Sequence, residues 1–229
     1  MISEIKFVNN NSLEKFRFKT LFTKEPETIF WIKKINKKDT LIDIGANVGV
    51  YSLFAGKNNI KTFSIEPFQK NYKSLKQNIR LNNLKNVKAL NFAISNFKGK
   101  AFFNDGGDTR HGSSGGFISK KKILKKDKSI NVTTVDNLMK TLKIKNNFHI
   151  KIDIDKDLIK LLKGFKKTIK NKKLKSVLIE VEKIEKKEVM AFFKPFMKVL
   201  NLEKIVKNHS SNRRAKKNSS IRNIIFSRK

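Results

Sequence analysis

The chain has 229 residues and no cysteine, and its 53 lysine and arginine residues against 19 acidic ones give a formal net charge of +34 at pH 7. This length suits one α/β domain with a full core, and the lack of cysteine excludes disulfides, thiolate metal sites and catalysis by a cysteine nucleophile. No apolar stretch is long enough to span a membrane, and residues 1–20 are too polar for a signal peptide, so we expect a soluble cytoplasmic protein.

The positive charge has two interpretations. Such a field attracts nucleic acid or an anionic membrane surface. However, the excess is mostly lysine, is spread along the whole chain and accompanies many Asn, Ile and Phe residues, as genomic base composition also produces. Nucleic-acid enzymes more often concentrate arginine and exposed aromatic residues on one face. We therefore favour a compositional origin and keep a nucleic-acid partner as the alternative.

Residues 1–39 predict an N-terminal lead-in followed by a helix. Alternating Phe16 and Phe18 favour an irregular or short β-rich segment over residues 1–22. Glu25-Pro26-Glu27 then predicts a helix start, because proline is tolerated in the first turn and acids suit the positive end of the helix dipole.

The central motif of the chain is residues 40–55. Leu41, Ile42 and Ile44 belong to an apolar run that predicts a buried parallel strand, and the following Gly45-Ala46-Asn47-Val48-Gly49 predicts a tight turn into a helix. Strand, turn and helix form the cofactor corner of a doubly wound sheet, where a Cβ would block the approach of a ligand to the backbone. A glycine turn that only shapes the corner is the alternative.

Two acids beside this turn separate the possible cofactor classes. A dinucleotide fold carries Gly-x-Gly-x-x-Gly, whereas the spacing here is Asp-x-Gly-x-x-x-Gly, and Asp43 would repel a pyrophosphate. Glu66, at the end of the strand predicted over 61–65, lies where such folds hold a ribose diol. S-adenosyl-L-methionine offers an amino-acid head, a ribose diol and no phosphate. We predict this cofactor, bound by Asp43, Gly45, Ala46, Asn47, Gly49, Glu66 and Pro67.

A helix over 68–81 and a third strand over 87–92 continue the pattern. Ser95 and Asn96 follow this strand, at a position that faces the adenine in this fold class, so we add them to the predicted cofactor contacts. An ordinary polar loop is the alternative.

Residues 97–135 do not form a standard helical crossover. Segments 101–103 and 130–133 predict inserted strands, and the glycine- and serine-rich stretch 104–116 predicts a mobile, lid-like loop over the site. His111 in this loop is a candidate general base near neutral pH, with a merely solvated histidine as the alternative.

The fourth predicted strand, residues 149–153, ends in acids. Lys151 and Asp153 share one face because strand side chains alternate, and together they could orient and deprotonate a substrate hydroxyl. With Asp155 and His111 they form the candidate catalytic set. The alternative is a buried ion pair that stabilises the strand end.

The remaining elements complete one domain over residues 1–229. We expect a helix over 155–170, a fifth strand over 176–181 with Glu180 and Glu182 at its end, a helix over 188–200 disturbed at Pro195, a basic loop over 208–220 and a closing strand over 221–227. No second domain, internal repeat or metal-ligand cluster is visible.

Several of these segments together resemble the FkbM-type S-adenosylmethionine-dependent methyltransferases. The likeness covers roughly residues 25–227, and its blocks are 43–52, 65–67, 82–87, 93–96, 133–138 and 150–155. The resemblance implies the class I methyltransferase fold, an α/β Rossmann-like, mainly parallel seven-stranded sheet with an antiparallel last strand and helices on both faces. It also implies O-methylation of a sugar or other small-molecule hydroxyl by in-line displacement, without a metal.

The chain departs from that family at two positions. Family members carry a glycine and then a glutamate just after the strand-end acid, whereas this chain has Lys156 and Leu158 there, and Asp157 could replace the lost carboxylate. A small-molecule or glycan acceptor is the favoured partner. The alternatives are an RNA methyltransferase that uses the basic surface and a non-catalytic cofactor-binding protein on the same fold.

Overall fold

The computed structural model describes residues 5–200 and 221–229, and the basic loop predicted over 208–220 lies outside them. Among the described residues, no helix combines the length and the apolar composition that crossing a bilayer requires.

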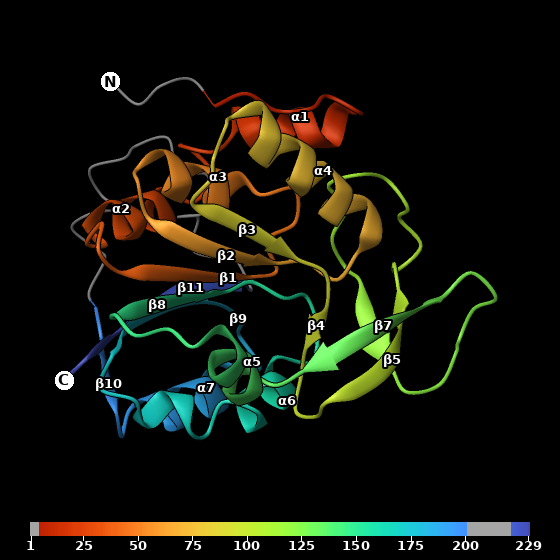
Figure 1. The fold of residues 1–229 in the computed structure, drawn as a ribbon. Helices are drawn as coiled ribbons and strands as arrows, with labels where there is room; N and C mark the ends of the chain where they lie inside the picture. Colours follow the sequence, from red (N-terminus) through yellow and green to blue (C-terminus); the bar gives the residue numbers. More distant parts are fainter. Residues whose placement is uncertain (1–4, 201–220) are drawn as a thin grey trace.

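A seven-stranded sheet forms the centre of the fold (Figure 1). Its strand order is β10-β11-β9-β8-β1-β2-β3. The strands are β1 (Thr40–Ile44), β2 (Lys61–Ile65), β3 (Val87–Leu90), β8 (Phe148–Ile152), β9 (Leu174–Glu182), β10 (Met197–Val199) and β11 (Ile221–Arg228). β11 pairs antiparallel with both β9 and β10, and the other five strands pair in parallel, which confirms the predicted mainly parallel sheet with an antiparallel last strand.

Helices cover both faces of this sheet (Figure 1). One layer contains α2 (Pro26–Lys34), α3 (Val50–Lys57) and α4 (Gln69–Leu81), and the other contains α5 (Val135–Leu142), α6 (Leu158–Lys163) and α7 (Lys186–Phe193). Leu41 packs into the first core, with Ile32 and Leu53, whereas its neighbour Ile42 packs into the second. β1 is therefore buried on both faces, as its continuous apolar run predicts.

A second sheet stands beside the first (Figure 1). Its order is β4-β7-β5-β6, formed by β4 (Ala93–Ile94), β5 (Gly99–Asn104), β6 (Phe117–Ser119) and β7 (Lys128–Thr133). The inserted strands predicted over 101–103 and 130–133 are thus confirmed. The third strand of the main sheet is shorter than predicted, because the chain leaves it after Leu90 and joins the second sheet at Ala93.

The prediction for the N-terminal segment is wrong, because residues Ser12–Lys19 form a helix, α1. The Asn11 side chain caps it by accepting hydrogen bonds from the backbone N–H groups of Leu13 and Glu14. Phe16 is 54% exposed whereas Phe18 is buried, so the alternation of the two phenylalanines reflects the two sides of a helix.

Two further helices are shorter than the sequence predicts. Asp157 has φ 66°, outside the helical region, so α6 begins only at Leu158, and it ends before Gly164; residues Thr168–Lys170 form a separate 3₁₀ turn. α7 ends at Phe193, ahead of Pro195, which lacks the N–H that a continuing helix needs. The predicted helix over 188–200 is therefore wrong beyond this point, where β10 adds a strand.

Candidate functional site

A cavity of about 260 Å³ opens at the carboxyl ends of the central strands. Strand order reverses at β1, which has β2 on one side and β8 on the other, and open α/β sheets bind ligands at such a point. The main sheet supplies residues after β1, β2, β8 and near the end of β9, and the second sheet supplies a wall. This wall includes Phe103, Phe117 and Ile118.

The glycine turn after β1 is shaped by the neighbouring strand. Gly45 has φ +80°, and a Cβ there would lie 1.8 Å from the Asp153 carbonyl oxygen. The Gly45 and Ala46 N–H groups both donate to the Ile65 carbonyl at 3.0 Å. Gly49 has φ +93°, and a Cβ there would lie 2.5 Å from Leu75 Cδ1 of α4. Close packing against the protein itself, rather than the ligand approach we expected, thus requires glycine at both positions.

Glu66 places a buried carboxylate in the wall of this cavity. It is 5% exposed, and its two oxygens accept hydrogen bonds at 2.8 Å from the backbone N–H groups of Asn47 and Phe68. Burial raises the pKa of Glu66 to about 7, although these two hydrogen bonds favour the charged form. Gly45, Asn47 and Pro67 line the same cavity, and Ala46 lines a smaller one beside it.

Lys151 is the centre of a buried charged cluster. Its side chain is 1% exposed, and Nζ donates to Asp153 Oδ2 at 2.7 Å and lies 3.8 Å from Asp43 Oδ1. Burial opposes the charge, but Asp153 and Asp43 outweigh it and raise the pKa of Lys151. Burial likewise opposes the charge of Asp153, yet the Lys151 ammonium holds the pKa of that carboxyl below its usual range. Asp153 lines the cavity as an ionised group.

Asp43 lies behind the turn. Ser52 Oγ donates to Asp43 Oδ2 at 2.5 Å, and Ser64 Oγ donates to Ser52 Oγ at 2.7 Å. Burial raises the pKa of Asp43. Asp43 is not among the residues that line either cavity, and its carboxylate lies beside the Lys151 ammonium.

The acids after β8 meet the inserted loop. Asp155 Oδ2 accepts a hydrogen bond from the Gly115 N–H at 2.7 Å, and burial raises the pKa of Asp155. Lys156 projects to the second sheet, with Nζ 4.5 Å from the centroid of the Phe117 ring. Leu158 is buried in the core. Of the two departures from the family pattern, only Lys156 therefore lies at the cavity.

The loop between β5 and β6 passes over the glycine turn and is anchored to α4. Asn71 Oδ1 accepts from the Gly112 N–H at 2.7 Å, and the Asn71 amide donates to the Ser113 carbonyl at 3.1 Å. The Asn47 amide donates to the same carbonyl at 2.8 Å. Ser113 lines the cavity, so this loop forms part of its wall, and the predicted mobility of the loop stays a prediction.

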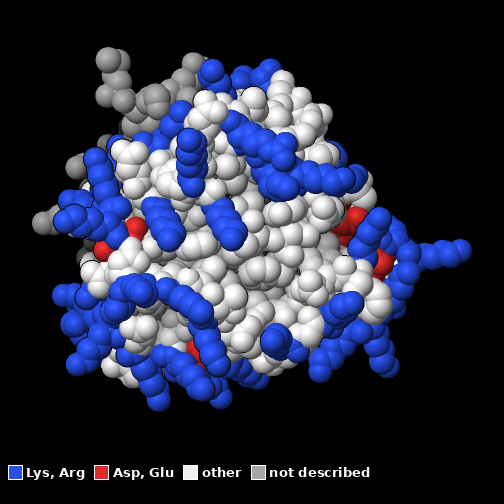
Figure 2. Space-filling view, viewed as in Figure 1, with Lys and Arg blue, Asp and Glu red and all other residues white. Residues whose placement is uncertain are grey.

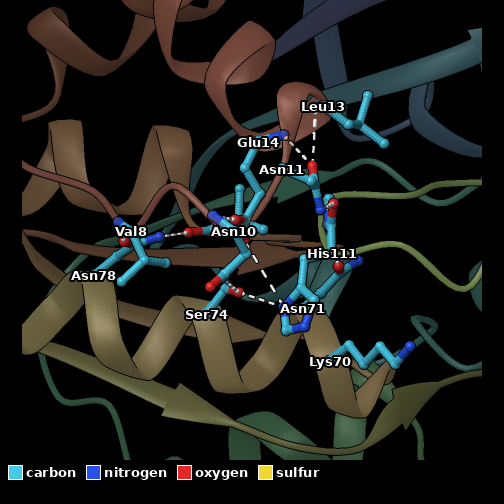
Figure 3. A network of polar contacts seen from close by, with 12 residues as sticks. Val8, Asn10, Asn11, Leu13, Glu14, Lys70, Asn71, Ser74, Asn78 and His111 are labelled. Atoms are coloured by element: carbon cyan, nitrogen blue, oxygen red, sulfur yellow. Dashed lines mark hydrogen bonds and ion pairs between the residues drawn. The ribbon is translucent and has the colours of Figure 1, made fainter.

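His111 lies between α1 and α4 (Figure 3) and is not among the residues that line the cavity. Its Nδ1 lies 2.8 Å from Ser74 Oγ and 4.0 Å from Glu14 Oε1, and its carbonyl accepts from the Asn11 amide at 3.0 Å. The structure thus separates His111 from Lys151 and Asp153, and gives it a place among the contacts that anchor the loop.

Ser95 and Asn96 also lie outside the lining of the cavity. Ser95 is buried, and its N–H donates to the Thr133 carbonyl at 2.9 Å as the second sheet continues. At the place expected for adenine the wall is apolar and contains Phe92, Ala93 and Ile94.

The charged lining residues that were not among the predicted site residues are Arg17, Lys24, Asp105, Lys156, Asp157 and Glu180. Glu180 carried a signal, because an acid at the carboxyl end of a parallel strand lies at the ligand edge. Arg17 carried none, because its helix was not predicted. The described part of the chain holds no group of three or more His, Cys, Asp or Glu side chains placed to bind a metal ion.

Comparison with known proteins supports this description. No curated protein matches the chain. An rRNA methylase from Streptococcus thermophilus has a similar structure, with TM-score 0.52 and 9% identity over 89% of this chain and 94% of that one. A precorrin-6y C5,15-methyltransferase from Geobacter metallireducens has TM-score 0.50 and 12% identity over 99% of this chain and 94% of that one. These likenesses show the class I methyltransferase fold.

The comparison with family models is more specific than the likeness in fold. The model described as the methyltransferase FkbM domain matches residues 43–210, which include the glycine turn, Glu66 and the acids after β8. The chain therefore belongs to the FkbM methyltransferase family.

Proposed function

We propose that this methyltransferase uses S-adenosylmethionine to methylate a hydroxyl group of a sugar or another small molecule. The observation that carries the proposal is the buried Glu66 carboxylate, held by two backbone N–H groups in the wall of a cavity beside the glycine turn. A carboxylate fixed in this way has lone pairs left to accept hydrogen bonds from a ribose diol.

The other lining residues fit the remaining parts of this cofactor. Phe92 and Ile94 offer apolar surface to an adenine ring. The adjoining cavity of about 40 Å³ is lined by Arg17, Lys24 and Glu25, which suit the carboxylate and the ammonium of an amino-acid head. S-adenosylmethionine has no phosphate, and none of the contacts assigned here needs one.

The reaction requires the acceptor to be positioned in line and to lose a proton. When bound, S-adenosylmethionine supplies a methyl group on a sulfonium. Lys151 holds Asp153 ionised, and the charged Asp153 carboxylate in the cavity wall helps to orient the acceptor. The loop anchored by Asn71 limits the access of water to the site.

The basic surface supports the RNA alternative (Figure 2). Many lysine and arginine side chains lie on the face in view, most densely around its margins, with few acids between them and uncharged surface in the middle. The cavity has the opposite character, since six of its lining residues are acids: Glu66, Asp105, Asp153, Asp155, Asp157 and Glu180. The ionised carboxylates among them, such as Asp153, would repel a phosphate backbone from the reacting centre, and therefore we favour a neutral, hydroxyl-bearing acceptor.

The test is transfer of a labelled methyl group from S-adenosylmethionine to a panel of methyl glycosides, polyols and phenols, and separately to RNA. We expect label in a hydroxyl-bearing small molecule and none in RNA. Label in RNA alone would favour the alternative, and bound cofactor without any transfer would favour a non-catalytic protein.

A further inference from the structure

Two carboxyl groups meet at the carboxyl ends of neighbouring strands. β8 and β9 are parallel, with Lys151 opposite Leu178 and Ile152 opposite Ile179, so the next residues, Asp153 and Glu180, are adjacent. Their side chains hydrogen-bond to each other, and both line the cavity. Two carboxyl groups can share a hydrogen bond only when one of them carries a proton, because a carboxylate has no donor. The pair therefore holds one proton.

Lys151 decides which partner holds it. The ammonium donates to Asp153 Oδ2 at 2.7 Å from a fully buried position, which stabilises the ionised form of Asp153. The proton accordingly lies on Glu180. Burial, and then the negative charge of Asp153 beside it, raises the pKa of Glu180 to about 8.

The charged groups on the other elements packed around Glu180 also shift its pKa. Glu25, before α2, raises the pKa of Glu180 further, while Lys151 lowers it. On β11 the residue opposite Glu180 is Asn223, whose amide donates to Glu27 Oε1 at 2.9 Å. Glu180 thus faces two neighbouring acids and one cation.

We propose that Glu180 is the general base that takes the acceptor proton, a role that rests on the function proposed above. In the fraction of the protein whose Glu180 is ionised, the acceptor hydroxyl donates its hydrogen bond to Glu180, and its proton moves to that carboxylate as the acceptor oxygen forms its bond to the methyl carbon. The carbon–sulfur bond breaks, and its electron pair stays on sulfur, which becomes a neutral thioether. Asp153 helps to orient the acceptor throughout and keeps its charge.

Asp153 and His111, which the sequence also offered for proton transfer, fit this task less well. Asp153 is bound to the Lys151 ammonium, which depresses its basicity. His111 lies outside the lining and contacts Ser74. A base is most effective when its pKa lies near the working pH. Of the two adjacent carboxyl groups, Asp153 and Glu180, only Glu180 meets that condition.

The test uses two cofactor analogues and needs no acceptor. Sinefungin carries an amine where the cofactor carries its sulfonium methyl, so its ammonium would point at the base, whereas S-adenosylhomocysteine has no group there. Both contain the ribose, so effects of Glu66 cancel in the ratio of their dissociation constants. Calorimetry from pH 6.5 to 8 should show the preference for sinefungin rising about tenfold, as Glu180 ionises.

Two variants make the assignment specific. Glu180→Gln keeps a donor for Asp153, so the fold should persist while the pH-dependent preference disappears. Glu182→Gln, an exposed residue on the same strand, should leave it unchanged. Carbon-13 NMR of glutamate-labelled protein should show one carboxyl titrating near pH 8, absent in Glu180→Gln.

The outcomes are distinct. A preference that does not vary with pH in the native protein, or that survives in folded Glu180→Gln, would overturn the role of Glu180. If S-adenosylhomocysteine itself does not bind, the proposed function fails, and the role of Glu180 fails with it.

Discussion

The cavity and the outer surface of this protein have opposite charge character. Six acids and three bases line the cavity, whereas the whole chain carries 53 basic residues against 19 acidic ones. Nearly a third of all acids thus gather at one site, and on the surface in Figure 2 lysine and arginine far outnumber the acids. The net charge of the chain therefore describes its outer surface and says little about the chemistry of a cavity lined mainly by acids. The predictions below test that separation.

Asp153→Asn should have the largest effect. The asparagine amide carries no charge, so it neither pairs with the Lys151 ammonium nor raises the pKa of Glu180. Turnover should fall about a thousandfold. The affinity for S-adenosylmethionine should change little, because Asp153 serves the acceptor. Steady-state kinetics and calorimetry measure the two quantities separately. Turnover within a few-fold of the native value would remove Asp153 from the reaction.

Gly45→Ala should lower the free energy of unfolding by about 3 kcal/mol, because the new methyl group would lie 1.8 Å from the Asp153 carbonyl in a left-handed backbone conformation. Gly107→Ala is the matched control on the inserted loop, with φ +92° and no described atom within 4 Å of the added Cβ. It should cost only about 1 kcal/mol. Urea unfolding compares them, and equal losses would contradict the close approach of β8.

Glu66→Gln should weaken cofactor binding about a hundredfold, since a ribose diol loses its charged acceptor. The folded pKa of Glu66, about 7, lies above its ordinary value, so acid neutralises the group within the physiological range. Because the hydroxyls donate to the ionised form, the native affinity should fall about tenfold from pH 8 to pH 6.

The variant itself provides the control for this pH dependence. Its weaker affinity should stay flat over the same range, because glutamine does not titrate. A native affinity that does not change with pH, or a variant that keeps the slope, would show that Glu66 does not contact the cofactor.

Asn71→Ala should have the smallest effect. It removes the two hydrogen bonds that hold Gly112 and Ser113 of the loop to α4, which costs about 1 kcal/mol locally. Amide hydrogen exchange should rise in residues 105–116 with little change in the sheet. Thr141→Ala, whose hydroxyl bonds only within α5 and is exposed, is the control. Unchanged exchange in the loop would show that other contacts anchor it.

The main sheet and the cofactor corner could be predicted because each depends on residues close together in the chain. Leu41 to Gly49 define a strand and turn by themselves, and Glu66 follows from the next strand end. α1 was missed although its cap is local, since Asn11 accepts from Leu13 and Glu14. Its packing depends on residues far apart in sequence, because Arg17 of this helix donates to the Gly112 carbonyl of the inserted loop.

For the candidate catalytic residues, too, contacts between neighbours in sequence could be predicted and contacts between distant residues could not. Lys151 and Asp153 were predicted to act together, and the structure joins them at 2.7 Å, because they are two residues apart at the carboxyl end of β8. The position of His111 depends on Ser74 and Asn11, which no spacing within the loop indicates. Glu180 becomes significant only when β9 is placed beside β8.

Calorimetric titration with S-adenosylmethionine, at about 0.1 M and about 0.5 M salt, tests the central claim most directly. Binding inside an acid-lined cavity should persist at high salt with at most a few-fold loss, because the surface lysines do not contribute to it. No binding by the folded protein, or binding that collapses as salt rises, would contradict the account and assign the recognition to the basic surface.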